Sequence, residues 1–323
     1  MINPKNILVT GATGFIGANL TRRLVNNNKD NIHIIIRKSS DVWRINDIKN
    51  RLNIHYANLN NNQELDKVIK KIKPDIIYHL ATYGSYPFHR ENSLKILKTN
   101  ILGTYNLLNA CISSGFKAFI NIGSSSEYGV KSKPMLENNL LEPDSYYGVA
   151  KASQTLLCQC LAKNKNLPIV TLRLFSPYGP YEASTRLVPV LINSCFDGKD
   201  LNLVSKKTVR DFNFIDDVVD AFLKTASNAN KLSGEILNIA NGRQRTLEEV
   251  VSLIINLTKS KSKLNWGGIK DYSPEAGIWE ADISKTKKFL NWSPSYNLES
   301  GIKETIIWFK KNRVKYKDKY VIR

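Results

Sequence analysis

The 323-residue chain has few acidic residues, few cysteines and no long apolar run, and each shortage excludes a class of protein. Apolar runs such as 32–36 have only the length of a strand, so we expect no membrane insertion. The four cysteines show neither C-x-x-C spacing nor a disulfide framework and read as reduced thiols. Because the N-terminus leads directly into an apolar strand, we also expect no signal peptide and a cytoplasmic location.

The shortage of acid leaves 28 Asp and Glu against 47 Lys and Arg, a formal net charge of +19. Such a surplus can serve nucleic acid, an anionic membrane or an acidic small substrate. The lysines are spread along the chain, and no helix-turn-helix, zinc-finger or RNA-binding signature accompanies them. We therefore expect no nucleic-acid partner. The histidines lack metal-ligand spacing, so we expect no metal site.

What the chain does have is an alternation of strands and helices joined by short links, which predicts an α/β fold with a doubly wound parallel sheet. We expect residues 1–175 to form one domain, with 213–242 packing back on it, and 176–323 to form a smaller, partly interleaved α/β lobe. The predicted strands are 6–10, 32–36, 53–56, 75–80, 117–123 and 168–175. The predicted helices are 15–27, 63–72, 93–114, 146–165 and 299–312.

A glycine-rich turn follows the first predicted strand, in the run Ile7-Leu-Val-Thr-Gly-Ala-Thr-Gly-Phe-Ile-Gly17. Strand, glycine turn and helix in this order place a dinucleotide pyrophosphate on backbone N–H groups at a helix N-terminus. Gly11 would make the tight turn, Gly14 would let phosphate approach the backbone, and Gly17 would allow close packing of helix on strand. The alternative is an ordinary strand-to-helix turn that needs glycine.

The second motif is Tyr147-x-x-x-Lys151 at the start of a predicted helix, which places both side chains on one face. A neighbouring ammonium favours the phenolate, so we expect Lys151 to lower the pKa of Tyr147. Ser124 stands where the strand 117–123 ends, at the edge where parallel sheets bind ligands. A solvent-facing helical pair is the alternative for Tyr147 and Lys151, and the glycine turn and Ser124 count against it.

Together these motifs resemble the extended short-chain dehydrogenase/reductase family, which acts on nucleotide-diphosphate sugars. The resemblance implies a Rossmann-type NAD(P) domain, a nucleotide-sugar lobe, hydride transfer, and a homodimer formed through helices 93–114 and 146–165. It implies catalytic roles for Ser124, Tyr147 and Lys151. The resemblance also rests on His79-Leu-Ala81, Thr99-Asn-Ile-Leu-Gly-Thr104, Arg173-Leu-Phe-Ser-Pro-Tyr-Gly-Pro180, Arg210-Asp-Phe-Asn-Phe-Ile-Asp-Asp217, Asn238-Ile-Ala-Asn-Gly242 and Asn291-Trp-Ser-Pro294.

The same resemblance supplies candidate contacts to the two ligands. The cofactor contacts would be Gly11, Thr13, Gly14, Phe15, Ile16, Gly17, Arg37, Ser39, Asn58, Leu59, Leu80, Ala81, Thr82, Asn100, Tyr147, Lys151 and Pro177. The substrate contacts would be Tyr83, Ser125, Ser126, Ser176, Arg186 and Arg210. An aromatic tract at 82–90 follows the fourth predicted strand, and its rings are candidates either for stacking on the sugar or for packing.

Members of this family that eliminate water resemble one another in an acid and a base directly after the catalytic hydroxyl. Here Ser125 and Ser126 occupy those two positions, and serines do not supply this chemistry. Glu127 stands one residue late, and only a local bulge would bring it into the site. The 4,6-dehydratase is therefore a weaker hypothesis than a reductase or an epimerase.

The end of the second predicted strand bears on the cofactor. NAD-specific sites carry Asp or Glu there, whereas this chain has Arg37, followed by Ser39. Arg37 can clamp a 2′-phosphate, which predicts NADP with NAD as the alternative; an exposed basic loop would explain Arg37 equally simply. NADP favours a reductase of a nucleotide-diphosphate 4-keto-6-deoxysugar in surface-polysaccharide synthesis. The alternatives are a 4-epimerase that retains NAD and a non-catalytic nucleotide sensor, for which Tyr147 and Lys151 would be superfluous.

Overall fold

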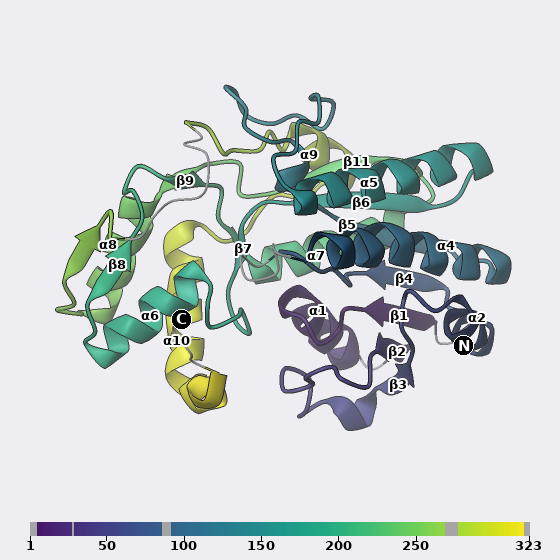
Figure 1. The fold of residues 1–323 in the computed structure, drawn as a ribbon, viewed down its shortest axis with the longest axis horizontal. Coiled ribbons are helices and arrows are strands. Elements are labelled where there is room, and N and C mark those ends of the chain that lie inside the picture. The colour runs from purple at the N-terminus through teal and green to yellow at the C-terminus, as the bar shows by residue number, and fades with distance from the viewer. Residues whose placement is uncertain (1–4, 28, 86–91, 269–276, 320–323) are drawn as a thin grey trace.

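Seven parallel strands form the central sheet (Figure 1). This computed structural model describes residues 5–27, 29–85, 92–268 and 277–319. The strand order is β11-β6-β5-β4-β1-β2-β3, and its reversal between β1 and β4 confirms the predicted doubly wound sheet. The strands are β1 (Asn6–Thr10), β2 (Asn31–Ile36), β3 (Asn53–Tyr56), β4 (Ile76–His79), β5 (Ala118–Ser124), β6 (Ile169–Leu174) and β11 (Ile236–Ile239).

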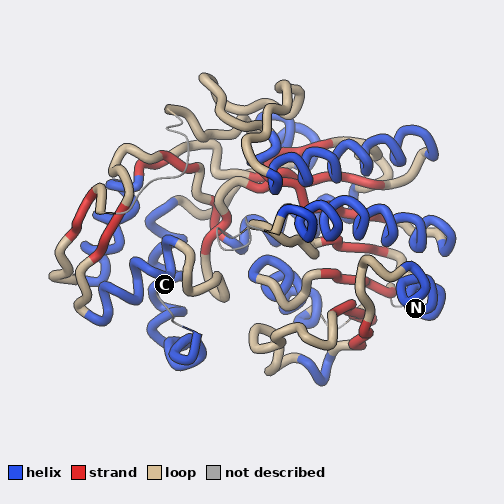
Figure 2. The backbone as a smooth tube through the Cα atoms, viewed as in Figure 1, coloured by secondary structure: helices blue, strands red, loops and turns tan. Residues whose placement is uncertain are grey.

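Helices cover both faces of this sheet (Figure 2). Leu8 of β1 packs in the apolar cluster that includes α2, α4 and α5, whereas its neighbours Ile7 and Val9 pack in the cluster that includes α1 and α7. Burial on both faces explains why the strands are apolar at nearly every position. The helices are α1 (Phe15–Asn26), α2 (Asn62–Ile72), α4 (Gly103–Ser114), α5 (Tyr146–Lys165) and α7 (Ile215–Asn228).

The helix predicted over 93–114 is not a regular α-helix throughout. It consists of α3 (Ser93–Leu97), a π-helical turn (Lys98–Leu102) and α4. Periodicity does not reveal such a turn, because the apolar pattern continues across it. Wide turns of this kind occur frequently at functional sites, and this one contains the buried Asn100.

The second lobe is built from three helices and three short strand pairs. The pairs are β7 (Pro177–Tyr178) with β10 (Asn213–Phe214), β8 (Leu201–Leu203) with β13 (Leu264–Trp266), and β9 (Val209–Arg210) with β12 (Arg245–Thr246). The helices are α6 (Leu187–Asp197), α8 (Leu247–Thr258) and α10 (Leu298–Asn312), while α9 (Ser284–Leu290) lies against β11.

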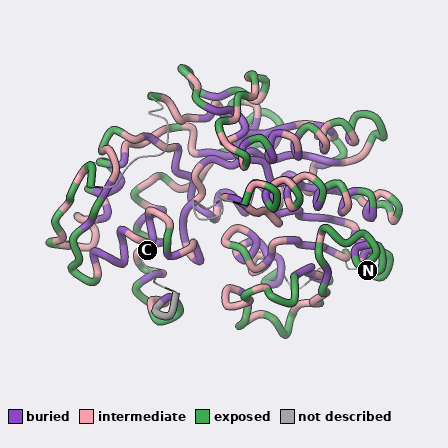
Figure 3. Tube along the Cα trace, viewed as in Figure 1, coloured by how far each residue is buried: buried purple, intermediate pink, exposed green. Residues whose placement is uncertain are grey.

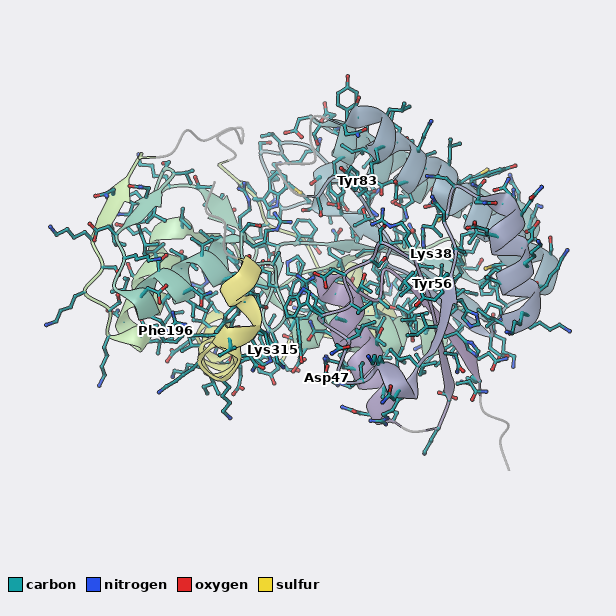
Figure 4. All side chains as sticks on the ribbon, turned by 60° about the horizontal axis from the view of Figure 1, so that its bottom comes forward. Lys38, Asp47, Tyr56, Tyr83, Phe196 and Lys315 are labelled. Carbon is teal, nitrogen blue, oxygen red and sulfur yellow. The ribbon has the colours of Figure 1, made fainter. Side chains whose placement is uncertain are left out.

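The lobe shares its interior with the sheet domain. A single apolar cluster includes Ile7 of β1, Phe222 of α7 and Ile254 of α8, and the buried segments of Figure 3 run through both parts. In Figure 4, Lys315 of the final 3-10 turn η5 (Arg313–Lys319) lies near Asp47; the hydrogen bond from Arg22 is the main cause that lowers the pKa of that carboxyl, and the Lys315 charge adds to it. No helix within the described ranges is long and apolar enough to cross a bilayer.

Candidate active site

The glycine turn lies at the carboxyl end of β1, beside the point where the strand order reverses. Gly11 has a φ of +73°, and a Cβ there would lie 2.6 Å from the backbone of Leu80 and Ala81. A Cβ on Gly17 would lie 2.1 Å from the carbonyl oxygen of Gly11. Both positions therefore exclude a side chain, one through its turn and its contact with the segment after β4, the other through packing of α1 on the turn.

Gly14 has a different environment. It is the N-cap of α1, no side chain caps this end, and the first turn contains no acidic residue. A Cβ on Gly14 would meet only the Gly11 carbonyl oxygen, at 3.2 Å. The first N–H groups of a helix, here including Phe15 and Ile16, have no acceptor within the helix. This end of α1 therefore suits a dinucleotide pyrophosphate, with Thr13 in the same turn.

The adenosine side of the candidate cofactor site is formed after β2 and β3. Figure 4 shows Lys38, in the turn after β2, near Tyr56 at the end of β3, which is paired with Ile36. Arg37 and Ser39 are exposed in this turn, which is closed by a 2.9 Å bond from Ser40 N to Arg37 O.

After β3, Asn58 is exposed and its backbone N–H donates to Glu64. Leu59 follows it and packs against α4, where a Cβ on Gly103 would lie 3.0 Å from the Leu59 Cβ. The predicted contacts Arg37, Ser39, Asn58 and Leu59 thus lie at the carboxyl ends of adjacent strands.

Asn100 in the π-helical turn holds the segment after β4. Its side-chain oxygen accepts bonds from the Thr82 hydroxyl (3.1 Å) and the Tyr83 N–H (2.9 Å), and its nitrogen donates to the Tyr83 carbonyl at 2.7 Å. The predicted cofactor role of Asn100 is therefore better explained as support of Thr82 and Tyr83. Residues 86–90 of the aromatic tract lie outside the described residues.

Ser124 and Tyr147 meet at the carboxyl end of β5. Ser124 and Thr82 lie close enough to the Tyr147 hydroxyl to act on its pKa as hydrogen-bonding groups, and Ser145 caps α5 two residues before Tyr147. Ser125 and Ser126 lie in the 3-10 turn η4 (Ser125–Glu127), beside the start of α5. The structure thus brings the predicted hydroxyl pair together.

The pKa of Tyr147 differs from the sequence-based expectation. Burial raises it above its ordinary value, and the opposing effects of Ser124, Arg186 and Thr82 do not offset this. The prediction that Lys151 lowers this pKa is wrong for this structure, because the ammonium donates to the Ile122 carbonyl and to Gln154 instead. Tyr147 is therefore protonated at neutral pH and can donate a proton.

Sequence reasoning missed the buried pair of Glu127 and Arg173. The Arg173 Nε lies 2.7 Å from a Glu127 carboxylate oxygen, and both side chains are almost completely inaccessible. The other carboxylate oxygen accepts from the Ser124 N–H at 2.8 Å. The 3-10 turn contains no bulge that would present Glu127 to the site, so this carboxylate has a structural role. Its distance of three residues from Ser124 is the capping-box spacing that could have revealed it.

The remaining predicted residues lie toward the lobe. Ser176 and Pro177 follow β6, and Pro177 of β7 pairs with Asn213 of β10. The Ser176 carbonyl accepts from the Asn213 N–H at 3.3 Å. Arg186 is the N-cap of α6 and acts electrostatically on both Tyr147 and Glu182. Arg210 stacks its guanidinium over Trp279 at 5.2 Å. Arg186 is thus the predicted lobe cation that the structure connects with Tyr147.

Glu182 is a second feature that the sequence did not reveal. Its carboxyl is buried, and burial raises its pKa to about 8 despite the attraction of Arg186. One of its oxygens has no hydrogen-bond partner in the described part of the chain. At neutral pH this side chain is mostly protonated, so it carries little negative charge toward Arg186.

Comparison with known proteins agrees with this geometry. A family model described as the NAD dependent epimerase/dehydratase family matches residues 7–240. The chain belongs to this family. It is therefore an enzyme that uses a nicotinamide dinucleotide to act on nucleotide sugars, as the resemblance predicted.

Three similar proteins show which activities occur among its relatives. The chain is 28% identical to a UDP-glucuronate 4-epimerase of Thermodesulfobacterium geofontis, over 94% of this chain and 96% of that one. It is 25% identical to a dTDP-glucose 4,6-dehydratase of Salmonella typhimurium, over 95% and 93%. A solved structure of UDP-glucuronic acid 4-epimerase from Bacillus cereus, in complex with UDP-glucuronic acid and NAD, is 30% identical with a TM-score of 0.84 over 94% and 99%.

Proposed function

We propose that this family member is an NADPH-dependent reductase of a nucleotide-diphosphate 4-keto-6-deoxysugar. The observation that carries the proposal is a protonated Tyr147, with Ser124 and Thr82 beside it, at a strand end where the described residues supply no unpaired acid or base. Elimination needs both groups. Ser125 and Ser126 cannot supply them, and Glu127 is committed to Arg173. Carbonyl reduction needs only a hydride and the proton that Tyr147 can donate.

In this reduction each residue of the site has a separate role. NADPH, when bound at the glycine turn, supplies the hydride that carbon 4 accepts. Ser124 orients the carbonyl oxygen, and the Tyr147 hydroxyl gives its proton to the oxygen as negative charge develops there. Arg186 lies close enough to stabilise the resulting phenolate, since it already favours that form of Tyr147. Lys151 lies one helical turn beyond Tyr147, and its ammonium donates to the Ile122 carbonyl and to Gln154.

A 4-epimerase is the second candidate, and the comparisons favour it. Relatives at 28% and 30% identity are described as 4-epimerases, one of them in complex with NAD. An epimerase uses the same serine and tyrosine but must first remove a proton from the sugar hydroxyl, so Tyr147 must start as the phenolate. The raised pKa of Tyr147 favours the reductase on this point.

Absorbance at the NADPH band tests the proposal directly. Purified protein is mixed with dTDP-, GDP- and CDP-4-keto-6-deoxysugars in turn, with NADH in parallel. Stoichiometric loss of NADPH with one of them is the expected result. Absence of consumption, together with NAD released when the protein is denatured, would instead establish the epimerase.

The choice of cofactor depends on Arg37. We expect Arg37→Ala to raise the KM for NADPH by about 10- to 100-fold, because a charge-assisted bond to the 2′-phosphate is lost. The KM for NADH should change little. Lys38→Ala, which alters the exposed neighbour in the same turn, is the matched control. Equal effects of Arg37→Ala on both cofactors would contradict the proposed NADP preference.

We also propose that the enzyme is a homodimer formed through α3, α4 and α5. Helix α5 lies against α3 and the π-helical turn, and exposed apolar side chains occur along these helices and the turn, among them Leu94, Leu102, Tyr105 and Leu156. Exposed apolar side chains on neighbouring helices are typical of a protein interface. We expect twice the chain mass of 36.6 kDa by light scattering, and a shift toward the monomer for Leu156→Lys. Val314→Lys, at an exposed site outside these helices, should leave the mass unchanged.

The proposal places this reaction in the cytoplasm and in the synthesis of surface-polysaccharide sugars. The state of the cysteines supports the cytoplasmic location, because all four are free thiols, three of them buried and Cys160 exposed. Exposed thiols persist where the environment is reducing.

A further inference from the structure

A chain of buried polar side chains lies behind the catalytic end of α5. The Lys151 ammonium donates to Gln154 Oε1 at 2.8 Å and to the carbonyl of Ile122. Gln154 Nε2 donates to Asn121 Oδ1 at 2.6 Å, and Asn121 Nδ2 donates to the Thr171 hydroxyl at 3.1 Å. The lysine, glutamine and asparagine are completely buried, and Thr171 is nearly so. The chain therefore links α5 to strands β5 and β6 within the interior.

The chemistry of the lysine decides the direction of every bond in this chain. An ammonium can only donate, so Gln154 must turn its oxygen toward Lys151. The Gln154 nitrogen then faces Asn121, which must present its own oxygen. The Asn121 nitrogen is left for Thr171, whose hydroxyl can accept. Each amide orientation thus follows from the previous one, and each side-chain oxygen and nitrogen of the two amides has a hydrogen-bond partner.

The Lys151 ammonium makes two hydrogen bonds within the described part of the chain. An ammonium has three donors, and the described residues take two of them, Ile122 and Gln154. The third takes no hydrogen-bond partner among the described residues, and the ammonium is completely buried in the ligand-free chain. Ordering the flexible lysine side chain costs conformational entropy. The two hydrogen bonds to Ile122 and Gln154 impose this order in the ligand-free protein, so ligand binding need not impose it again.

The ammonium is costly to keep charged at this place. Burial lowers the pKa of Lys151 to about 8, although Glu127 and Cys158 oppose the decrease. Of the other groups that face it, His79 is neutral because burial lowers its pKa to about 3, and Arg173 is paired with Glu127. Tyr147, one turn away, is protonated. A neutral acceptor in direct contact therefore matters for the charge state.

We propose that Gln154, oriented by Asn121, is a positioning residue that keeps the Lys151 ammonium charged and fixed in place between α5 and β5. The inference needs the proposed function only for the role of Lys151 in turnover. It applies equally to a reductase and to an epimerase, since both need the charged lysine. The glutamine is on the same helix, three residues beyond the lysine, where its oxygen reaches the ammonium without any change of backbone.

The first test is a pH titration of Lys151 in the full-length protein, free of ligand. Lysine labelled at Cε and Nζ is followed by NMR, and the signal of Lys151 is identified by its absence in Lys151→Arg. In Gln154→Met we expect the titration midpoint to fall by about one pH unit, because the ammonium loses an acceptor. In Gln154→Glu the midpoint should rise by at least as much. Asn121 and Thr171 can reverse their bond to accommodate the second carboxylate oxygen.

Gln159→Met is the matched control, since Gln159 lies on the same helix and donates to the Gly234 carbonyl away from the lysine. Its midpoint should equal that of the wild type. Identical midpoints in wild type, Gln154→Met and Gln154→Glu would overturn the proposal. If Gln154→Met does not fold, Gln154→Glu decides alone, because an unchanged midpoint there has the same meaning.

Turnover supplies an independent second readout. The alkaline limb of the kcat/KM profile should move to lower pH in Gln154→Met and to higher pH in Gln154→Glu, in step with the NMR midpoints. A wild-type protein that reduces no 4-keto sugar would refute the proposed reductase but would leave the titration result intact. Normal titration shifts with an unmoved kinetic limb would show that Gln154 does not act on catalysis through Lys151.

Discussion

Tyr147→Phe is expected to reduce the rate of 4-keto sugar reduction by about 10²- to 10⁴-fold, the usual contribution of a positioned acid. The variant keeps the ring and loses only the hydroxyl that hydrogen-bonds with Ser124 and Thr82. Glu127, the nearest carboxyl on the described strand end, cannot replace it because it is paired with Arg173. Single-turnover oxidation of NADPH measures the chemical step apart from product release.

Two comparisons make this result specific. Tyr146→Phe removes the hydroxyl of the neighbouring tyrosine, which is 60% exposed, and should retain wild-type turnover. NADPH binding, followed by its fluorescence, should change by less than about tenfold in Tyr147→Phe, since one neutral hydrogen bond at most is lost. Turnover within a factor of ten of the wild type would show that Tyr147 is not the proton donor.

Arg173→Met is expected to lower the free energy of unfolding by about 3–5 kcal/mol. The substitution leaves the Glu127 carboxylate buried without its cation, and that uncompensated charge is the cause of the loss. Arg173 also donates to the Glu137 carbonyl at 3.1 Å and lies over the Tyr128 ring. Urea unfolding followed by circular dichroism measures the change.

A second substitution separates charge from packing. In Arg173→Met/Glu127→Gln neither residue of the pair is charged, so we expect a large part of the lost stability to return. Lys303→Met breaks the ion pair with Glu299 on the surface of α10 and should cost about 0.5 kcal/mol or less. If Arg173→Met is no more destabilising than Lys303→Met, the buried pair does not stabilise the fold.

The parts of the site that could be predicted share a local origin. The glycine turn lies within eleven consecutive residues, and the roles of Gly11 and Gly17 follow from a turn and a helix that those same residues form. The spacing of Tyr147 and Lys151 is one helical turn. The apolar runs of the strands and the alternation with helices predicted the sheet, since burial on both faces depends on composition over a few residues.

Other parts depended on residues far apart in the sequence. Lys151 was expected to act on Tyr147, but its ammonium is bound by Ile122 and Gln154, and burial instead controls the tyrosine. The sequence alone left open whether Glu127 could act as a base in the site. The structure pairs it with Arg173, which is 46 residues away. No local pattern specifies how deeply a side chain is buried or which partner reaches it.

The sequence by itself therefore determined the fold class, the glycine turn and the family, because these depend on periodicity and on motifs of a few residues. The tertiary structure alone decided the charge states and orientations at the site. These follow from desolvation and from hydrogen bonds between α5, β5 and β6, which form only when the strands have assembled. In this enzyme the identity of the catalytic groups is local information, and their chemistry is set by the interior around them.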